Sequence, residues 1–241
     1  MWDFILSLFC AIFGTCDDDE CRSLTHKGAA YTVCSFQTAQ VSIRLHLKDK
    51  AGKPYRRLSQ LDRTLTAQKQ TPTMLMNGGM YHSDLGPVGL YIENQKSVKR
   101  VSTKGGWGNF HLLPNGVFWV KNKRVGVTET NVFLKRGLKP DHATQSGPML
   151  VISGKLHPRF LKNSDSLKIR NGVGVTADGK TVHFAISRRT VTFHEFGTLF
   201  KERLKTPNAL YLDGTVSAIR ASAISQGGWR ELGPMISVVK R

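Results

Sequence analysis

The feature that most constrains this fold is a succession of short apolar segments that each end in turn residues. Residues 41–47 (VSIRLHL) alternate strictly, with apolar side chains on one face and polar side chains on the other. Period-two alternation is typical of a half-buried strand. Residues 31–36 are expected to pair with it. A chain built from such segments is predicted to be rich in β-structure.

Three pairs of these segments flank tight turns and are predicted to form hairpins. Asp-Gly and similar pairs favour the backbone conformations that join antiparallel strands. The hairpins are residues 88–93 with 96–101, 117–120 with 124–127, and 172–176 with 181–187 around Asp178-Gly179. Further strands are expected at residues 73–76, 209–212 and 236–239.

Two segments have helical spacing instead. Leucines recur every three or four residues within 56–69, and apolar residues do the same from Phe193 to Leu204, before Pro207. Such spacing places one apolar stripe against a core. No linker and no repeat interrupts the pattern, so the chain is predicted to be one α+β domain, with a mixed β-sheet core and flanking helices.

The amino terminus carries a short apolar run, FILSLFCAIF over residues 4–13. It is too short to span the ~30 Å of hydrocarbon in a bilayer. Small residues follow it, as in a signal peptide, so residues 1–16 are predicted to be a signal segment and residues 21–241 the domain. The alternative is a buried first strand or helix, because no Lys or Arg precedes the run. We expect a periplasmic or secreted protein whose mature chain has no stable membrane insertion.

The cysteines fit that location. Removal of the apolar run takes Cys10, and Cys16, Cys21 and Cys34 are then three, an odd number. A disulfide between Cys21 and Cys34 would suit an oxidising compartment, with Cys16 either free or lost. No C-x-x-C pair is present, so a cysteine-rich zinc site is not expected.

Charge narrows the class of partner. Lys and Arg number 35 against 17 Asp and Glu, a formal net charge of +18. This excess favours an anionic partner. The basic residues are dispersed in small groups and no nucleic-acid-binding signature accompanies them, so nucleic acid is not the expected partner. The sequence leaves the oligomeric state open.

Polar side chains that could carry chemistry gather in four loops at strand ends. Each loop alone reads as an ordinary turn. The loops are Asn77-Gly78-Gly79-Met80-Tyr81-His82, Gln145-Ser146-Gly147-Pro148, Arg170-Asn171-Gly172 and Asp213-Gly214-Thr215-Val216-Ser217.

Taken in order, these loops, together with Gly89-Leu-Tyr and Gly108-Asn-Phe, resemble the phosphodiester glycosidase domain family. The resemblance runs from about Cys21 to Val239, with the core motifs in 72–239. It implies a hydrolase that cleaves a sugar-1-phosphodiester at the glycosidic C–O bond, releasing a sugar and a phosphomonoester. It also implies loops gathered around one anion-binding cleft, with a cell-envelope glycan as a candidate substrate.

The resemblance also implies roles for residues. Asp213 matches the family's carboxylate and is expected to be catalytic, while Arg170 is expected to grip the phosphate with paired donors. The glycines of the first loop are expected to let the backbone approach a ligand. The full set expected to bind substrate is Asn77, Gly78, Gly79, Tyr81, His82, Gln145, Ser146, Gly147, Asn171, Gly214 and Ser217.

Three questions stay open at this point. Glu195 is the candidate second catalytic carboxylate, although Thr192 to Glu195 also has the spacing of a helix capping box; His82 and His194 are alternative proton carriers. No cofactor or tightly bound metal is expected, while a loosely held divalent cation beside Asp213 stays open. The rival functions are a non-catalytic module that binds anionic glycans and a phosphodiesterase that breaks the P–O bond.

Overall fold

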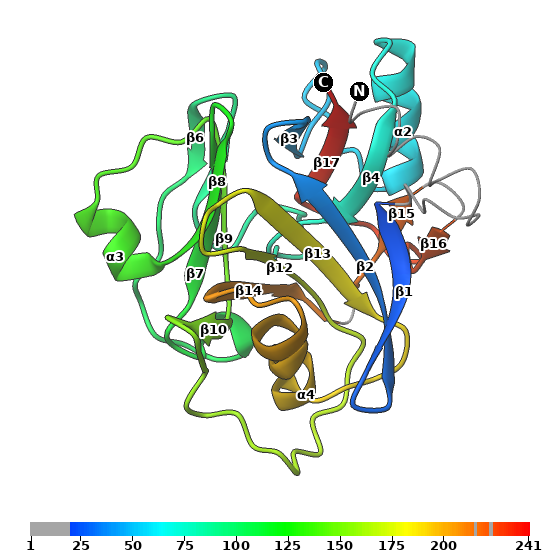
Figure 1. Ribbon diagram of the computed structural model, residues 1–241. Coiled ribbons are helices and arrows are strands. Elements are labelled where there is room, and N and C mark those ends of the chain that lie inside the picture. The colour runs from blue at the N-terminus through cyan, green and yellow to red at the C-terminus, as the bar shows by residue number, and fades with distance from the viewer. Residues whose placement is uncertain (1–19, 215, 222–223) are drawn as a thin grey trace, which may run out of the picture.

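The computed structural model describes residues 20–214, 216–221 and 224–241. Within them, the strands form three antiparallel sheets around a shared apolar core (Figure 1). The predicted α+β class is confirmed. The predicted signal segment, Cys10, Cys16 and Thr215 lie outside the described residues.

The largest sheet has seven strands and carries two of the four loops singled out above. In spatial order it contains β1 (Cys21–His26), β2 (Ala29–Gln37), β13 (Thr181–Ser187), β12 (Asn171–Val175), β14 (Asn208–Asp213), β10 (Met149–Ile152) and β11 (Lys155–Leu156). The central strand β12 is buried along its whole length. It therefore carries no polar outer face and reads as a continuous apolar and glycine segment.

The other two sheets have five strands each. One runs in the order β16 (Ile224–Gln226), β15 (Ile219–Ala221), β4 (Pro72–Asn77), β17 (Met235–Lys240) and β3 (Val41–His46). The other runs β6 (Lys96–Lys99), β5 (Tyr91–Glu93), β9 (His142–Ser146), β7 (Gly116–Lys121) and β8 (Arg124–Glu129). The three predicted hairpins are confirmed as β5–β6, β7–β8 and β12–β13.

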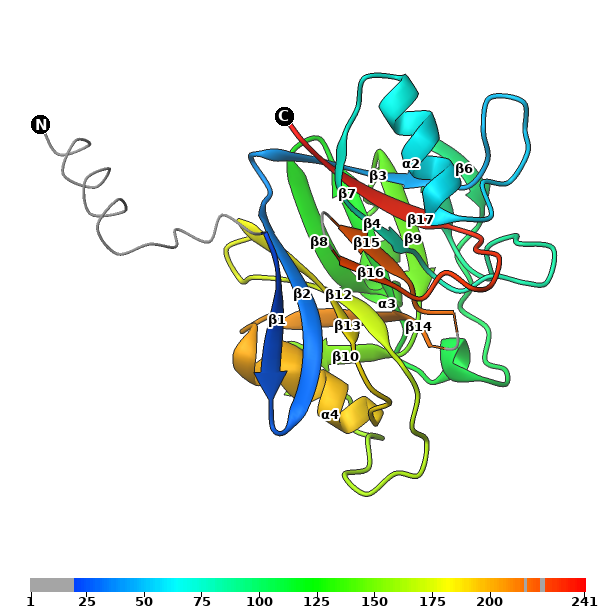
Figure 2. The ribbon, with the colours of Figure 1, turned by 90° about the vertical axis from the view of Figure 1, so that its right-hand side faces the viewer.

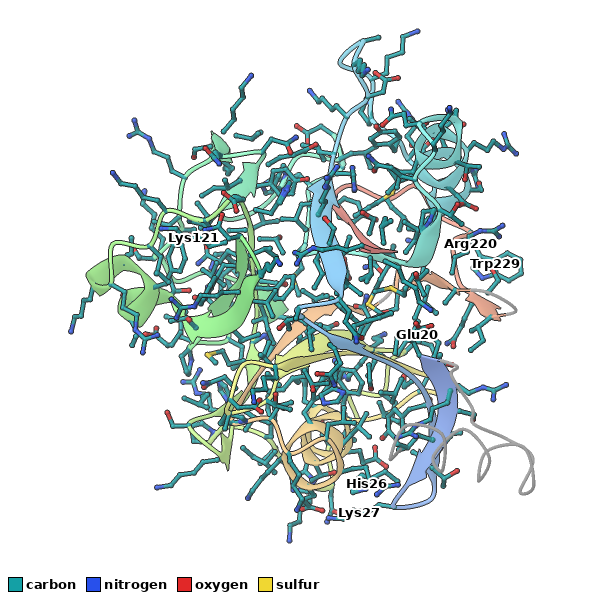
Figure 3. All side chains as sticks on the ribbon, turned by 45° about the horizontal axis from the view of Figure 1, so that its top comes forward. Glu20, His26, Lys27, Lys121, Arg220 and Trp229 are labelled. Atoms are coloured by element: carbon teal, nitrogen blue, oxygen red, sulfur yellow. A yellow bond between two sulfur atoms is a disulfide. The ribbon has the colours of Figure 1, made fainter. Side chains whose placement is uncertain are left out.

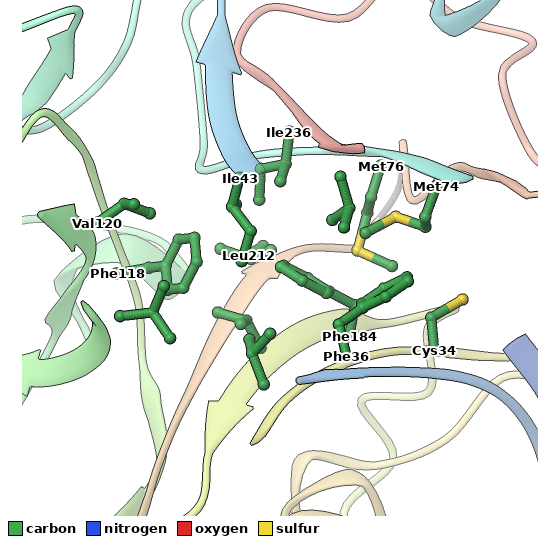
Figure 4. Close-up of a cluster of buried hydrophobic side chains, with 14 of the residues drawn as sticks. Cys34, Phe36, Ile43, Met74, Met76, Phe118, Val120, Phe184, Leu212 and Ile236 are labelled. Atoms are coloured by element: carbon green, nitrogen blue, oxygen red, sulfur yellow. The ribbon is translucent and has the colours of Figure 1, made fainter. Parts of the chain in front are cut away.

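The core lies where the three sheets face one another. Phe36 and Phe184 come from the seven-stranded sheet, Ile43 and Met76 from the second sheet, and Phe118 from the third (Figure 4). All five side chains are buried. Burial of this apolar surface is the main favourable contribution to folding.

Helices cover the outer faces of the sheets. Helix α2 (Leu58–Ala67) packs Leu58, Leu61 and Leu65 against the second sheet, as their spacing predicted. Helix α4 (Phe193–Thr198) and the π-helical turn η2 (Leu199–Arg203) cover the seven-stranded sheet. The short helix α3 (Thr130–Lys135) lies on the third sheet. None of the described helices is long and apolar enough to span a bilayer.

One predicted strand pairing is wrong. Residues 31–36 do not pair with residues 41–47: β2 lies between β1 and β13, and β3 pairs with β17. A turn at residues 38–40 carries the chain from one sheet to another. Because β2 is largely buried, its backbone N–H and C=O groups need hydrogen-bond partners along both edges, and β1 and β13 supply them.

The predicted disulfide is confirmed. Cys21 and Cys34 face each other across the β1–β2 hairpin and are bonded. The bond ties the edge strand β1 to the interior of the sheet.

Candidate active site

Two predicted site residues lie at the ends of adjacent strands. Strands β12 and β14 are hydrogen-bonded neighbours in which Asn171 lies opposite Asp213 (Figure 1). Arg170 directly precedes Asn171. Arg170 and Asp213 are 43 positions apart in sequence, and the sheet places them at the same end of neighbouring strands.

A chain of buried amides holds the Asp213 backbone. The Asp213 N–H donates to Asn171 Oδ1 at 2.8 Å, and Asn171 Nδ2 donates to Asn77 Oδ1 at 2.8 Å. The Ala218 N–H also donates to Asn77 Oδ1, at 2.8 Å. Asn77 and Asn171 are fully buried, and Asn77 Nδ2 has no partner among the described residues. An unpaired buried donor is costly, which makes Asn77 Nδ2 a candidate ligand contact.

The pKa of the Asp213 carboxyl is shifted in a direction that bears on chemistry at this site. Burial raises its pKa to about 6, against a smaller opposing effect from the Gly214 N–H. That N–H donates to Asp213 Oδ1 at 2.6 Å. The Ser217 hydroxyl donates to the Asp213 carbonyl at 3.0 Å and closes the loop on itself. A carboxyl with a pKa near neutrality can exchange a proton during a reaction.

Arg170 is enclosed rather than open to a cleft. Its side chain is fully buried, with its guanidinium carbon 3.6 Å from the centre of the Phe193 ring. Nε donates to the Val191 carbonyl at 2.9 Å and Nη2 to the Ser166 carbonyl at 2.7 Å. Burial lowers its pKa. Two of its three nitrogens are thus engaged with carbonyl groups of the protein, and its expected grip on a phosphate stays a prediction. Nη1 alone has no partner among the described residues.

Tyr211, which the sequence reasoning missed, lies between these two groups. It precedes Asp213 by two positions on β14, and its ring packs edge-on against Phe193 at 4.8 Å. Burial and then the Asp213 charge raise the pKa of Tyr211, while the Arg170 charge and a hydrogen bond with Asn109 lower it. The pKa of the Tyr211 hydroxyl is therefore affected by both Asp213 and Arg170. Its spacing from Asp213 was the available signal.

Tyr81 approaches Asp213 from the first loop. Its hydroxyl donates to the Glu231 carbonyl at 2.7 Å. Burial and then the Asp213 charge raise the pKa of Tyr81, and the Arg230 charge lowers it. Arg230 is exposed and was also missed, because nothing in its surrounding sequence distinguishes it from other surface arginines.

The other residues of the first loop have different surroundings. A side chain at Gly79 would lie 2.7 Å from the Gln145 carbonyl, and one at Gly78 would lie 3.2 Å from Pro234. The glycines therefore allow a close approach of the protein's own backbone, where a ligand contact was expected. His82 is exposed and lines a separate hollow with Lys48 and Val98.

The second loop is part of the protein framework. Gln145 and Ser146 lie in strand β9, although a loop was expected. Gln145 Oε1 accepts from the N–H groups of Leu90 and Ser102 at 3.0 and 2.9 Å, and the Ser146 hydroxyl donates to the Leu212 carbonyl at 2.7 Å. Gly147 packs against Asn115. The Ser146 contact joins the third sheet to β14 directly before Asp213 and so helps to position that residue.

Glu195 forms the capping box of α4. Its Oε2 accepts from the Thr192 N–H at 2.7 Å, and its own N–H donates to the Thr192 hydroxyl at 3.0 Å. Its charge raises the pKa of Tyr31, after the larger effect of burial. These contacts account for Glu195 as a helix cap. Its catalytic role, like that of His194, stays a prediction.

Metal-ligating residues do not gather at this site. Among the described residues, no group of three or more His, Cys, Asp and Glu side chains is arranged to hold a metal ion. The groups that interact with Asp213 are amides and tyrosines. The Tyr211 hydroxyl interacts with Asn109 of the helix η1 (Asn109–His111). Strands β12 and β14, whose ends carry Arg170 and Asp213, lie side by side in the seven-stranded sheet (Figure 2).

Comparison with known proteins places this arrangement in context. A family model described as phosphodiester glycosidase matches residues 70–232. The uncharacterized protein YigE of Escherichia coli (strain K12) is 38% identical over 188 residues, which are 78% of this chain and 72% of that protein.

Two solved structures share the fold. The catalytic domain of zebrafish N-acetylglucosamine-1-phosphodiester alpha-N-acetylglucosaminidase, auto-inhibited by its pro-peptide, superposes with a TM-score of 0.60 at 13% identity, covering 92% of this chain and 82% of that one. A hypothetical protein from Synechocystis gives a TM-score of 0.57 at 13% identity, covering 92% of this chain and 61% of that one.

Proposed function

Since this chain belongs to the phosphodiester glycosidase family, we propose that it hydrolyses a sugar-1-phosphodiester at the bond between the anomeric carbon and the phosphate oxygen. The observation that carries the proposal is the Asp213 carboxyl, whose pKa is raised to about 6 by burial. It stands at the end of β14 in a frame of buried amides, and its charge acts on Tyr81 and Tyr211.

Asp213 is the reacting carboxylate in this proposal. Breaking the sugar C–O bond builds positive charge on the ring, and a carboxylate stabilises that charge, attacks the anomeric carbon or deprotonates water. The leaving group is a phosphomonoester with a second pKa of about 6, so it departs without a strong general acid. One carboxylate can therefore suffice where ordinary glycosidases use two.

Three donors would hold the phosphate. Arg230 is exposed and its charge acts on Tyr81, so its guanidinium can reach a ligand beside the first loop. Asn77 Nδ2 and Arg170 Nη1 are buried donors without partners among the described residues. Donors of this kind stabilise the negative charge that develops on a departing phosphate.

Tyr211 would position the two ends of the site. Its hydroxyl interacts with Arg170, Asn109 and Asp213, so it links the phosphate side to the carboxylate.

The disulfide Cys21–Cys34 supports export, because such bonds persist in oxidising compartments. We place the activity in the periplasm or outside the cell, on a glycan of the envelope.

The direct test is hydrolysis by the wild type and by Asp213→Asn. The asparagine keeps an oxygen for the Gly214 N–H but removes the charge. We expect turnover to fall by a factor of about 10² or more with an unchanged circular dichroism spectrum. Near-normal turnover in the folded variant would remove Asp213 from this role.

A second measurement fixes the bond that breaks. In oxygen-18 water, C–O cleavage places the label in the free sugar, and P–O cleavage places it in the phosphate. Label in the phosphate would make the protein a phosphodiesterase. Glycan binding without any product would make it a binding module.

A further inference from the structure

Two tryptophans are almost entirely exposed. Trp107 is 99% exposed and Trp229 is 90% exposed, whereas Trp119 is 8% exposed in the third sheet. An indole buries a large apolar area when it has a partner, so leaving it in water forgoes a large gain in free energy. Large exposed apolar groups on a folded surface mark binding sites when they gather in one place.

The loop that carries Trp107 is anchored next to the candidate site. The Ser102 N–H donates to Gln145 Oε1 at 2.9 Å, and Gln145 Nε2 donates to the Ser102 carbonyl at 2.7 Å. The His111 ring contacts the Lys104 carbonyl at 3.0 Å. Asn109, two residues beyond Trp107, interacts with the Tyr211 hydroxyl. Trp107 therefore stands on a fixed loop at the edge of the site.

The loop that carries Trp229 is also anchored to residues that interact with Asp213. Gly227 has a φ of +75° and packs so closely on Ser217 that a side chain there would clash with the Ser217 carbonyl. At the other end of the loop, the Glu231 carbonyl accepts from the Tyr81 hydroxyl. Figure 3 shows Trp229 at the periphery, directed outward. One end of its loop thus contacts Ser217 and the other contacts Tyr81, and both of these residues interact with Asp213.

We propose that Trp107 and Trp229 are stacking platforms for sugar rings. The apolar C–H face of a sugar covers an aromatic ring, and the hydroxyls stay in water. Because each loop is anchored to residues that interact with Asp213, the structure assigns the substrate to oligosaccharide or polysaccharide phosphodiesters, whose sugars extend beyond the cleaved linkage. This inference rests on the proposed function and names the substrate class of the same site.

The test compares two substrates that share one linkage. One is the methyl ester of N-acetylglucosamine 1-phosphate, a phosphodiester with a single sugar. The other is an oligosaccharide phosphodiester with at least two sugars on each side of the same linkage. The quantity measured is the ratio of their two kcat/KM values, which reports the preference for the extended substrate.

We expect Trp107→Ala and Trp229→Ala each to lower this ratio about tenfold, through KM of the extended substrate. Trp→Phe at each position should restore part of it. Leu134→Ala is the matched control, because Leu134 is an exposed apolar residue on α3, outside the site. An unchanged ratio in both tryptophan variants would overturn the inference and leave the proposed hydrolysis standing.

A binding measurement keeps the inference separate from catalysis. The Asp213→Asn chain is titrated with the extended oligosaccharide, with tryptophan fluorescence and calorimetry as readouts. Binding that weakens about tenfold on adding Trp107→Ala or Trp229→Ala supports the inference even if no phosphodiester is hydrolysed. Equal binding with and without these substitutions would mean that the exposed tryptophans serve another partner, and it would refute the sugar platforms.

Discussion

At the scale of single residues, the protonation of Asp213 governs the proposed reaction. Burial raises its pKa from 3.8 to about 6, so the carboxylate form becomes dominant only above that pH. If the ionised form reacts, kcat/KM should rise about tenfold per pH unit below pH 6 and level off above it. A pH–rate profile from pH 4.5 to 8 measures this.

The profile also has a clear contrary outcome. Activity that falls as the pH rises through 6 would mean that Asp213 acts as a proton donor. Circular dichroism across the same range serves as the control, because loss of the fold at low pH would imitate a protonation effect.

The sequence predicted some of these residues and could not predict others. Asp213, Asn171 and Asn77 stand in motifs with turn residues, and the structure brings all three together through hydrogen bonds. Tyr211 and Arg230 carry no motif of their own. Their importance depends on which strand and which loop lie beside β14, and such contacts between distant segments leave no local trace in the sequence.

At the scale of helices and strands, the capping box of α4 separates two roles for Glu195. Glutamine can replace glutamate in a capping box. If Glu195 acts only as a cap, Glu195→Gln should keep the stability and the turnover of the wild type, whereas Thr192→Ala should lose about 1 kcal/mol of unfolding free energy. Chemical denaturation and initial rates measure both.

A severe loss of turnover in folded Glu195→Gln would restore Glu195 as a catalytic carboxylate. Thr192→Ser is the matched control, because it keeps the hydroxyl that accepts from the Glu195 N–H.

The disulfide is the second prediction at this scale. Cys21 and Cys34 are 13 positions apart, and a bond that closes a loop of this size stabilises a chain by about 3 kcal/mol. The double variant Cys21→Ser, Cys34→Ser should have a lower melting temperature than the wild type. Reductant should lower the melting temperature of the wild type to the same value. A wild type that is insensitive to reductant would contradict this.

The pairing of strands that are close in sequence was predictable, and the pairing of strands that are far apart in sequence was not. The turn at Asp178-Gly179 joins β12 to β13 within a few residues, so the sequence contains the whole hairpin. The pairing of β3 with β17 joins residues almost 200 positions apart. The alternation in residues 41–47 identified a strand correctly but carried no information about its neighbour.

At the scale of the whole molecule, the net charge of +18 should act on substrate capture. A positive surface attracts an anionic phosphodiester, and salt shortens the reach of that attraction from about 10 Å at 0.1 M to about 3 Å at 1 M. We expect kcat/KM to fall as salt increases, mainly through KM. Steady-state kinetics at several ionic strengths measures this.

Arg230→Gln should reduce the salt dependence, since it removes a charge beside Tyr81. Lys121→Gln, on the third sheet, is the matched control for the same change of net charge. Equal salt dependence in all three proteins would contradict a local role for Arg230.

The order of strands has a consequence for biosynthesis. Asn77 lies in β4, whose neighbours in the sheet are β15 and β17. Asp213 lies in β14, which needs β12 and β10. A ribosome that has made residues 20–214 has therefore supplied Asp213 but not the strands that fix Asn77. The proposed catalytic centre needs Met235–Lys240, the strand that pairs with β4 beside Asn77. We therefore expect a nascent chain that lacks this strand to be inert toward phosphodiesters.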